Sequence, residues 1–403
     1  MSTSNIVILF STRIIRLFCY GFLSVVLALY LAEAGLTEGQ IGLLFTLTLV
    51  GDAVITLWLT TSADRFGRKR TLIWGAFLMA GAGLAFAATR NIILLILAAI
   101  IGVISPSGNE IGPFLSVEQA ALTQLISNKS RTGFFAWYAL AGSLATATGA
   151  LSGGWLAQIL QNNGWTALAA YRVVLIGYAL GGFLLLLLFL NLTESVEVES
   201  PQTETKRILG LHRSRSVVFK LSFLFAMDAF AGALLVQSLI AYWFHVRFGV
   251  ESGVLGSIFF GANILAGISA LLAVRLADKF GLINTMVFTH IPSNVLLILV
   301  PLMPTLPLAI GVLLLRFSIS QMDVPTRQSY TMAVVAPDER SAASGVTSIA
   351  RSVGASVSPA LTGLLFSIPV LFNAPFFLAG GLKIIYDLLL YREFRAVKPP
   401  EET

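Results

Sequence analysis

The chain has 403 residues, of which 56% are hydrophobic and only 11% are charged, and its mean hydropathy is +0.85. Soluble domains carry about 25% charged residues, so this composition excludes a water-covered globular protein and indicates an integral membrane protein. Anionic lipid headgroups explain the net charge of +6, and no aromatic-interleaved basic groove indicates nucleic acid. The single cysteine, Cys19, leaves neither an internal disulfide nor a cysteine-based metal site.

Apolar runs separated by polar breaks predict twelve membrane spans, because about 20 helical residues cross a hydrocarbon core of about 30 Å. The predicted spans are 11–34, 39–63, 71–89, 92–124, 133–160, 167–192, 216–246, 252–277, 282–303, 306–334, 341–368 and 371–391. Arg13 and Arg16 come ahead of the long apolar segment of the first span, which lacks a signal-peptide cleavage pattern. We therefore expect this span to be retained.

Positive charge is unevenly distributed over the connections between spans. The connections after even-numbered spans contain Arg65, Arg68, Lys69, Arg70, Lys129, Arg131, Lys206, Arg207, Arg213, Arg215, Lys279 and Arg340. Those after odd-numbered spans contain little positive charge, with Arg90 and Arg247 as exceptions and Arg172 early in the sixth span. By the positive-inside rule, both termini and the even-numbered connections are predicted to be cytoplasmic, in an inner or plasma membrane.

A polar segment divides the chain near its middle and predicts three parts: an N-terminal six-helix bundle (1–192), a cytoplasmic linker (193–215) and a C-terminal six-helix bundle with a short cytoplasmic tail (216–403). The halves repeat. Gly35, Gly42, Asp64 and Gly67 align with Gly249, Gly256, Asp278 and Gly281, and Gly102, Gln119, Arg131 and Gly154 align with Gly311, Gln328, Arg340 and Gly363. Two repeated six-helix halves with a site near the midplane are typical of transporters.

The connection between the second and third spans reads Asp64-Arg65-Phe66-Gly67-Arg68-Lys69. It resembles the major facilitator superfamily signature G-x-x-x-D-R-x-G-R-[RK], with Thr60 in place of the opening glycine. The second half keeps Asp278 and Gly281 of this signature, and residues 142–154 resemble the antiporter motif of the family, with Ala150 where proline is usual. The resemblance implies an all-α membrane fold of twelve transmembrane helices in two pseudo-symmetric six-helix bundles.

The same resemblance implies a cytoplasmic latch that holds the halves together. In the family, the motif aspartate caps a helix of the other half, and the motif arginine pairs with an acid low in the fourth helix. The residues that correspond here, or lie in the expected place, are Asp64, Arg65, Gly67, Arg68, Glu118 and Asp278. A carboxylate facing a helix N-terminus is stabilised by the helix dipole, which supports the first contact independently. The alternative is an ordinary positive-inside loop.

Ionisable residues inside predicted spans are costly unless they are paired or hydrated, so they mark a proton or substrate pathway. The candidates are Asp52, Glu110, Asp228, Arg316, Asp323 and Arg327. Asp52 and Glu110 have no partner nearby in the sequence, so either is expected to carry a proton. Arg316, Asp323 and Arg327 are spaced to share one helical face. The structural alternative is internal pairing of Asp323 with Arg327, and of Lys383 with Asp387; His290 is expected to be a satisfied polar residue and His212 a surface residue.

A secondary transporter accounts for the repeat, the motif and the intramembrane carboxylates. By resemblance to drug/proton antiporters, the expected function is proton-coupled efflux by alternating access; the alternatives are symport or uptake of a specific metabolite, or a non-transporting membrane scaffold. A phosphate-binding G-x-x-x-x-G-K-[ST] loop is absent from the sequence, and no catalytic or metal-binding constellation stands out. We therefore expect no enzyme activity, cofactor or metal. The expected partners are a small-molecule substrate, a proton and the lipid bilayer, with the monomer as the functional form.

Overall fold

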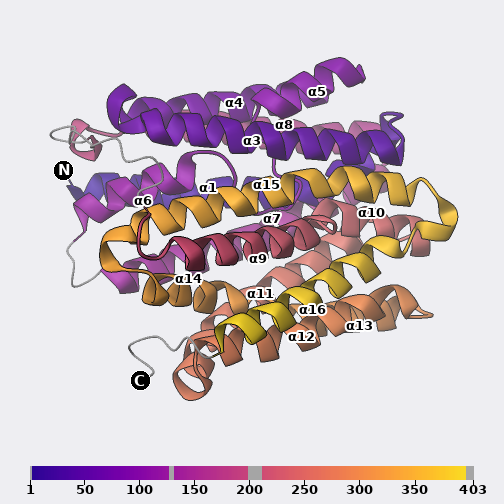
Figure 1. Ribbon diagram of the computed structural model, residues 1–403. Coiled ribbons are helices and arrows are strands. Elements are labelled where there is room, and N and C mark those ends of the chain that lie inside the picture. Colours follow the sequence, from indigo (N-terminus) through magenta and orange to yellow (C-terminus); the bar gives the residue numbers. More distant parts are fainter. Residues whose placement is uncertain (1, 127–130, 198–210, 396–403) are drawn as a thin grey trace. The chain divides into compact units, whose positions relative to one another are not determined.

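The computed structural model describes residues 2–126, 131–197 and 211–395. Within these ranges all regular structure is helical (Figure 1), which confirms the predicted all-α membrane fold. A helix suits the bilayer because it satisfies its backbone hydrogen bonds within one segment. By length and composition, nine helices in the described ranges can each cross a membrane, and Ile92–Ile101 and Leu306–Phe317 are shorter apolar helices.

The chain forms two compact units. Unit 1 comprises Met1–Thr203 and Val236–Phe260, and unit 2 comprises Glu204–Leu235 and Gly261–Thr403. The contacts thus assign residues 236–260, from the second half of the sequence, to unit 1. The predicted division into 1–192, 193–215 and 216–403 stays a prediction about the order of the parts along the chain.

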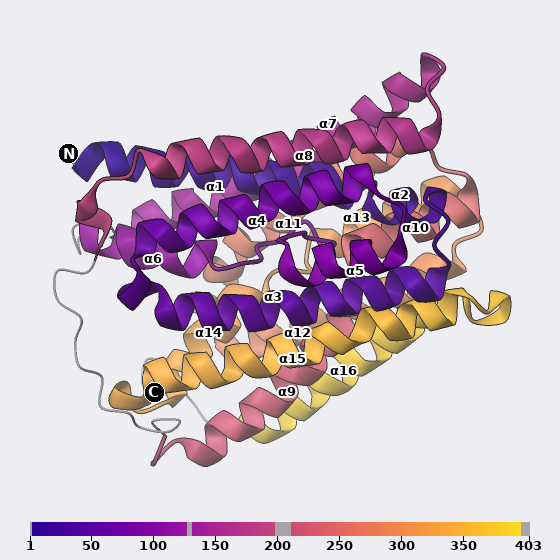
Figure 2. The same cartoon turned by 90° about the horizontal axis from the view of Figure 1, so that it is seen from above.

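Unit 1 is built on close packing of α1 against α7 and of α4 against α8 (Figure 2). Glycine permits the first contact, because a Cβ on Gly149 would lie 2.0 Å from the carbonyl oxygen of Phe18. This explains the glycine-rich run that resembles the antiporter motif. The helices are α1 (Ser2–Ser24), α2 (Leu27–Glu33), α3 (Glu38–Phe66), α4 (Arg68–Ala88), α5 (Ile92–Ile101), α6 (Phe114–Leu125), α7 (Arg131–Asn162), α8 (Ala167–Leu190), η1 (Glu194–Val196), α10 (Gln237–Phe248) and the start of α11 (Ser252–Phe280).

Unit 2 packs α9 against α15 and α16, and α12 against α16 and α14 (Figure 1). Its apolar core includes Leu221 and Phe225 of α9 together with Tyr330 and Tyr386. The helices are α9 (Arg215–Ala233), the rest of α11, α12 (Leu282–Leu299), η2 (Val300–Leu302), α13 (Leu306–Phe317), α14 (Asp323–Val334), η3 (Pro337–Glu339), α15 (Arg340–Phe366), η4 (Pro369–Leu371) and α16 (Ala374–Phe394).

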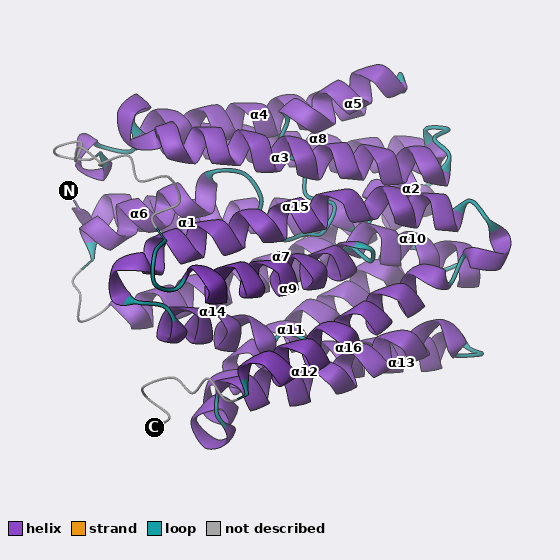
Figure 3. Cartoon of the chain, in the orientation of Figure 1, coloured by secondary structure: helices purple, strands orange, loops and turns teal. Residues whose placement is uncertain are grey.

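Four predicted spans are each interrupted, and they are the first in each successive group of three spans. The interruptions separate α1 from α2, α5 from α6, α9 from α10 and α13 from α14, and Figure 3 distinguishes the helices from the connecting loops. Each of these spans is therefore two helices, and not the one continuous helix that an unbroken apolar run predicts. Between α5 and α6 the cause is local: Pro106 and Pro113 lack an N–H donor, and Gly108 and Gly112 have φ of 71° and 77°.

In unit 1, polar groups at three of the helix interruptions form hydrogen bonds with one another. The Ser238 hydroxyl donates to the carbonyl oxygens of Ser24 (2.6 Å) and Pro106 (2.7 Å), and the Ser238 N–H also donates to Pro106 (3.0 Å). Gln237 donates to the Ser24 hydroxyl at 2.7 Å. Carbonyl groups freed by broken helices therefore find partners without water, as a membrane protein requires.

The glycine of the motif, Gly67, has a backbone conformation that is suited to glycine. Gly67 precedes α4 with φ of 97°, and its counterpart Gly281 precedes α12 with φ of 83°. Both values are in the region that favours glycine, so the repeat holds at the level of backbone conformation. The side chains of Asp64 and Arg65 lie outside the described residues, and the capping contact of Asp64 stays a prediction.

Candidate functional site

A buried ion-pair network, the unit 1 cluster, joins Arg13 and Arg16 of α1 to Glu110 and Glu118. Arg16 and Glu118 are fully buried and form two parallel bonds of 2.7 and 2.8 Å. Arg16 Nε also donates to Glu110 at 2.7 Å, and Arg13 reaches the other Glu110 oxygen at 3.2 Å. Two guanidinium groups thus neutralise two carboxylates. The fork of Arg16 matches the planar carboxylate, which is the geometry of strong charge-assisted bonds.

The network corrects two sequence-based expectations. Glu110, expected to be alone, is held by two arginines. Glu118 does not pair with Arg68; besides Arg16, it accepts hydrogen bonds from Thr12 (2.9 Å) and Tyr138 (2.5 Å).

Asp52 of α3 differs from both glutamates. Its Oδ1 atom accepts the Gly112 N–H at 2.7 Å and the Thr56 hydroxyl at 3.2 Å. No cationic side chain in the described chain contacts it. Of the two carboxylates expected to be unpaired, only Asp52 remains so.

A second network, the unit 2 cluster, converges on Asp228 of α9. Lys383 of α16 contacts Oδ1 at 2.6 Å, while Arg327 of α14 and Arg351 of α15 contact Oδ2 at 3.1 and 3.2 Å. Arg327 also pairs with Asp323 at 2.7 Å, which confirms the predicted pairing within the tenth span. Arg351 and Lys383 were missed as candidates, although each is a cation within an apolar helix and was recognisable by that criterion.

The remaining polar residues of unit 2 give two corrections and one confirmation. Lys383 does not pair with Asp387; instead Asp387 contacts His290 at 2.8 Å and accepts a hydrogen bond from Asn294 at 3.2 Å. His290 is thus a satisfied polar residue, as expected. The predicted shared face of Arg316, Asp323 and Arg327 is wrong, because α13 ends at Phe317 and α14 begins at Asp323.

The side chain of Arg316 forms no ion pair or hydrogen bond with the described part of the chain. Its buried Nε atom has no hydrogen-bond partner there. The guanidinium carbon lies 4.9 Å from the centre of the Phe317 ring, at a distance suited to a cation–π contact. Arg316 therefore contributes positive charge to unit 2 that no described carboxylate contacts.

In each unit a carboxylate from a distant part of the sequence caps a helix, which the sequence did not reveal. In unit 1, Glu197 accepts the N–H groups of Arg68 (2.7 Å) and Lys69 (3.1 Å) at the start of α4. The Arg68 side chain donates to Gln124 at 3.0 Å and to the Val196 carbonyl at 3.3 Å. The predicted latch loop is thus anchored to the chain that follows α8. Asp278, the second-half counterpart, is exposed near the end of α11.

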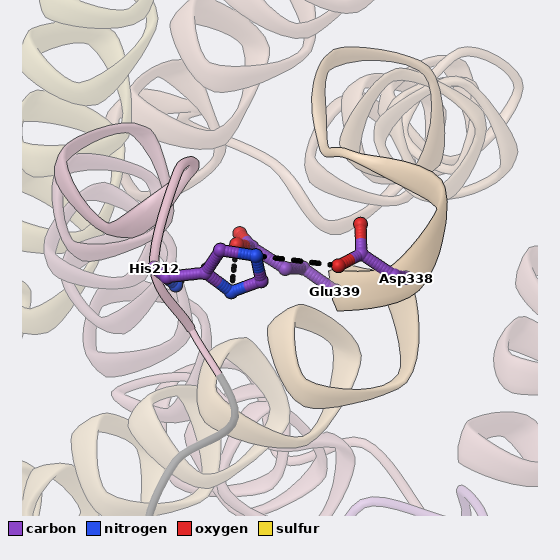
Figure 4. Close-up of side chains that lie close together, drawn as sticks. All are labelled: His212, Asp338 and Glu339. Carbon is purple, nitrogen blue, oxygen red and sulfur yellow. Dashed lines mark hydrogen bonds and ion pairs between the residues drawn. The ribbon is translucent and has the colours of Figure 1, made fainter.

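In unit 2, Glu339 accepts the N–H groups of His212, Arg213 and Ser214 at 2.7 to 2.8 Å ahead of α9. His212 also places one ring nitrogen 2.7 Å from Glu339 and the other 3.3 Å from Asp338 (Figure 4). Burial by itself raises the pKa of the Glu339 carboxyl, but the backbone donors outweigh it and lower the pKa to about 2. Helix capping accounts for this group of side chains. His212 was expected to be a surface residue; it is exposed, but it also contacts both carboxylates.

The comparisons with known proteins agree with this architecture. A family model described as the Major Facilitator Superfamily matches residues 9–359 and 248–403. The chain belongs to the major facilitator superfamily. Members of this family are transporters, so the chain is a membrane transporter of small molecules.

Individual relatives extend this result. The chain is 31% identical over 427 residues to the uncharacterized membrane protein YJR124C of Saccharomyces cerevisiae, with 98% of this chain and 95% of the relative covered. The fold is similar to a bacterial homologue of the human lysosomal transporter Spinster (TM-score 0.74, 18% identity, 97% and 96% covered). It is also similar to a D-xylose-proton symporter (TM-score 0.73, 14% identity, 96% and 97% covered).

Proposed function

We propose that this transporter exports an amphiphilic small molecule by alternating access in exchange for protons, and that Asp52 carries the proton. The observation that supports the proposal is the isolation of the Asp52 carboxylate from every described cation. Asp52 lies about 21 Å along α3 from Glu38, close to the depth of the membrane midplane. An ionised carboxylate at this depth costs several kcal/mol unless it is paired or hydrated, and protonation removes that cost.

The surroundings of Asp52 provide a route from proton binding to helix movement. Both hydrogen bonds end on Oδ1, which leaves Oδ2 available for a proton. The donor Gly112 belongs to the interruption between α5 and α6. A carboxylate accepts a stronger bond from an N–H group than a neutral acid does, so protonation weakens the hold of Asp52 on this interruption. Glu110, which two arginines neutralise, is the weaker candidate.

The test is coupled transport by the purified protein in proteoliposomes with an imposed pH gradient. A panel of amphiphilic compounds is added outside vesicles that are acidic inside and contain a pH-sensitive dye. We expect an active compound to raise the internal pH, because protons leave as the compound enters; symport would lower it. Asp52→Asn should abolish this proton flux and retain exchange of labelled for unlabelled compound.

Glu251→Gln is the matched control, because Glu251 is an exposed carboxylate in the connection between α10 and α11. It should support proton flux at the wild-type rate. Undiminished proton flux in Asp52→Asn would refute the role of Asp52. Wild-type transport at a rate that does not depend on the pH gradient would refute proton coupling altogether.

The orientation and the latch complete the proposal. Both termini are proposed to be cytoplasmic, and Asp64, Arg65, Gly67, Arg68 and Asp278 to stabilise the state that is closed on that side. The capping of α4 by Glu197 supports this role, because it fixes the start of the helix that follows the motif loop. Asp64→Asn should then increase the labelling of cytoplasm-facing positions in an accessibility assay. Unchanged labelling would count against the latch.

A further inference from the structure

In the unit 2 cluster, the cations in direct ion-pair contact outnumber the carboxylates. Lys383, Arg327 and Arg351 come from three helices and contact the single carboxylate of Asp228. Asp323 supplies a second carboxylate, through Arg327. Asp387, on α16, contacts His290 and Asn294; it interacts with Lys383 electrostatically but forms no ion pair with any of the three cations. Three cations therefore share two carboxylates.

Arg351 is the accessible member of this cluster. Its side chain is 34% exposed, compared with 8% for Arg327 and 10% for Lys383. Within the described chain, its single hydrogen bond joins Nη1 to Asp228. A guanidinium group has five N–H donors, so four of them remain available to solvent or to a ligand.

The position of Arg351 indicates that its exposed face meets a hydrated space. Arg351 lies about 16 Å along α15 from Arg340, well inside the span. A guanidinium group at this depth is too costly to face lipid. Its partner Asp228 is only 3% exposed and is held from α14 and α16 as well, so the Arg351 side chain turns toward the polar interior of unit 2.

We propose that Arg351 binds an oxyanion group, a carboxylate, sulfonate or phosphate, on the transported molecule. Asp228 fixes the guanidinium, and Lys383 and Arg327 supply the positive field that favours an anion. The planar fork of an arginine suits bidentate recognition of such a group. An organic cation would be repelled by the excess charge. This inference rests on the proposed transport function and names its substrate class as amphiphilic organic anions.

The test uses three probes that share one apolar body: 4-phenylbutyrate, 4-phenylbutyramide and 4-phenylbutylamine. Their binding to the purified full-length protein in detergent at pH 7 is measured by titration calorimetry. The acid should bind at least ~10-fold more tightly than the amide or the amine, because only the acid pairs with the guanidinium. Arg351→Gln should weaken binding of the acid at least ~10-fold, while Arg351→Lys keeps the charge but loses the fork and should give an intermediate affinity.

Arg392→Gln is the matched control, because Arg392 is an exposed arginine near the end of α16. It should bind the acid as the wild type does, and melting curves establish that each variant is folded. Equal affinity for the three probes, no binding of the acid, or undiminished binding of the acid by folded Arg351→Gln would overturn the proposal.

The binding measurement needs no pH gradient, so it separates substrate class from coupling. Anion-selective binding without proton flux would support the role of Arg351 and refute proton coupling. Proton flux together with equal affinity for the charged and neutral probes would support coupling and refute the role of Arg351.

Discussion

The polar clusters of the two units differ in charge balance although the units repeat in sequence. In the unit 1 cluster two arginines meet two glutamates, and Asp52 stands apart as a carboxylate without a cation. In the unit 2 cluster three cations meet two aspartates, and Arg316 stands apart as a cation without a carboxylate. Among groups in direct contact, the charges of the unit 1 cluster therefore balance, whereas cations outnumber carboxylates in the unit 2 cluster.

This difference shows which features of a repeated fold are kept and which diverge. Both halves keep the interrupted helices and the glycine turns, because these belong to the backbone and serve packing. The charged side chains have diverged, because each position can be changed without altering the helix that carries it. We interpret the result as a division of labour in which unit 1 handles the proton and unit 2 the anionic group of the substrate.

The largest expected effect comes from breaking the balanced cluster. Arg16→Gln leaves Glu118 fully buried without a cation, and losing one partner of a buried ion pair costs about 3–5 kcal/mol. Chemical or thermal unfolding in detergent measures the loss in free energy of unfolding. Arg13→Gln is the control: the Arg13 side chain is 11% exposed, and among the carboxylates it pairs only with Glu110, which Arg16 would still neutralise, so it should cost clearly less. Equal losses would mean that the balance of the cluster does not govern stability.

A smaller but substantial effect is expected from making the unit 2 cluster more positive. Asp228→Asn removes the carboxylate that three cations share, and we expect a loss of about 3 kcal/mol in unfolding free energy. Because the excess charge then grows, 4-phenylbutyrate should raise the melting temperature of this variant more than that of the wild type. Asp387→Asn, outside the group of three cations, should show no such enhanced response. The same response in both variants would contradict the assigned charge balance.

The smallest expected effect concerns the carboxylates that cap helices, Glu197 in unit 1 and Glu339 in unit 2. The folded protein lowers the pKa of Glu339 from its ordinary value of 4.5 to about 2. Its stabilising contribution is therefore complete above about pH 4.5 and is lost as the pH falls through about 2. The difference in melting temperature between wild type and Glu339→Gln should shrink as the pH is lowered from 6 to 3. A difference that stays constant over this range would show that the charge of the cap is unimportant.

The sequence by itself determined the features that depend on neighbouring residues. Apolar runs long enough to cross a bilayer predicted the all-α membrane fold, and the alignment of Gly67 with Gly281 is matched by positive φ at both residues. The pairing of Asp323 with Arg327 was also predictable, because four residues span one helical turn. Of the four interrupted spans, the sequence indicates the break only in the fourth, where Pro106 and Pro113 lie between α5 and α6.

The tertiary structure decided which charges are paired. Glu118 is 102 residues from Arg16, and Asp228 is 99, 123 and 155 residues from its three cations. Periodicity within one helix contains no information about partners at such separations. Local sequence fixes which residues enter the membrane, whereas helix packing determines whether each buried charge meets an opposite charge. For this reason Asp52 and Glu110, alike in sequence, have opposite surroundings in the folded chain.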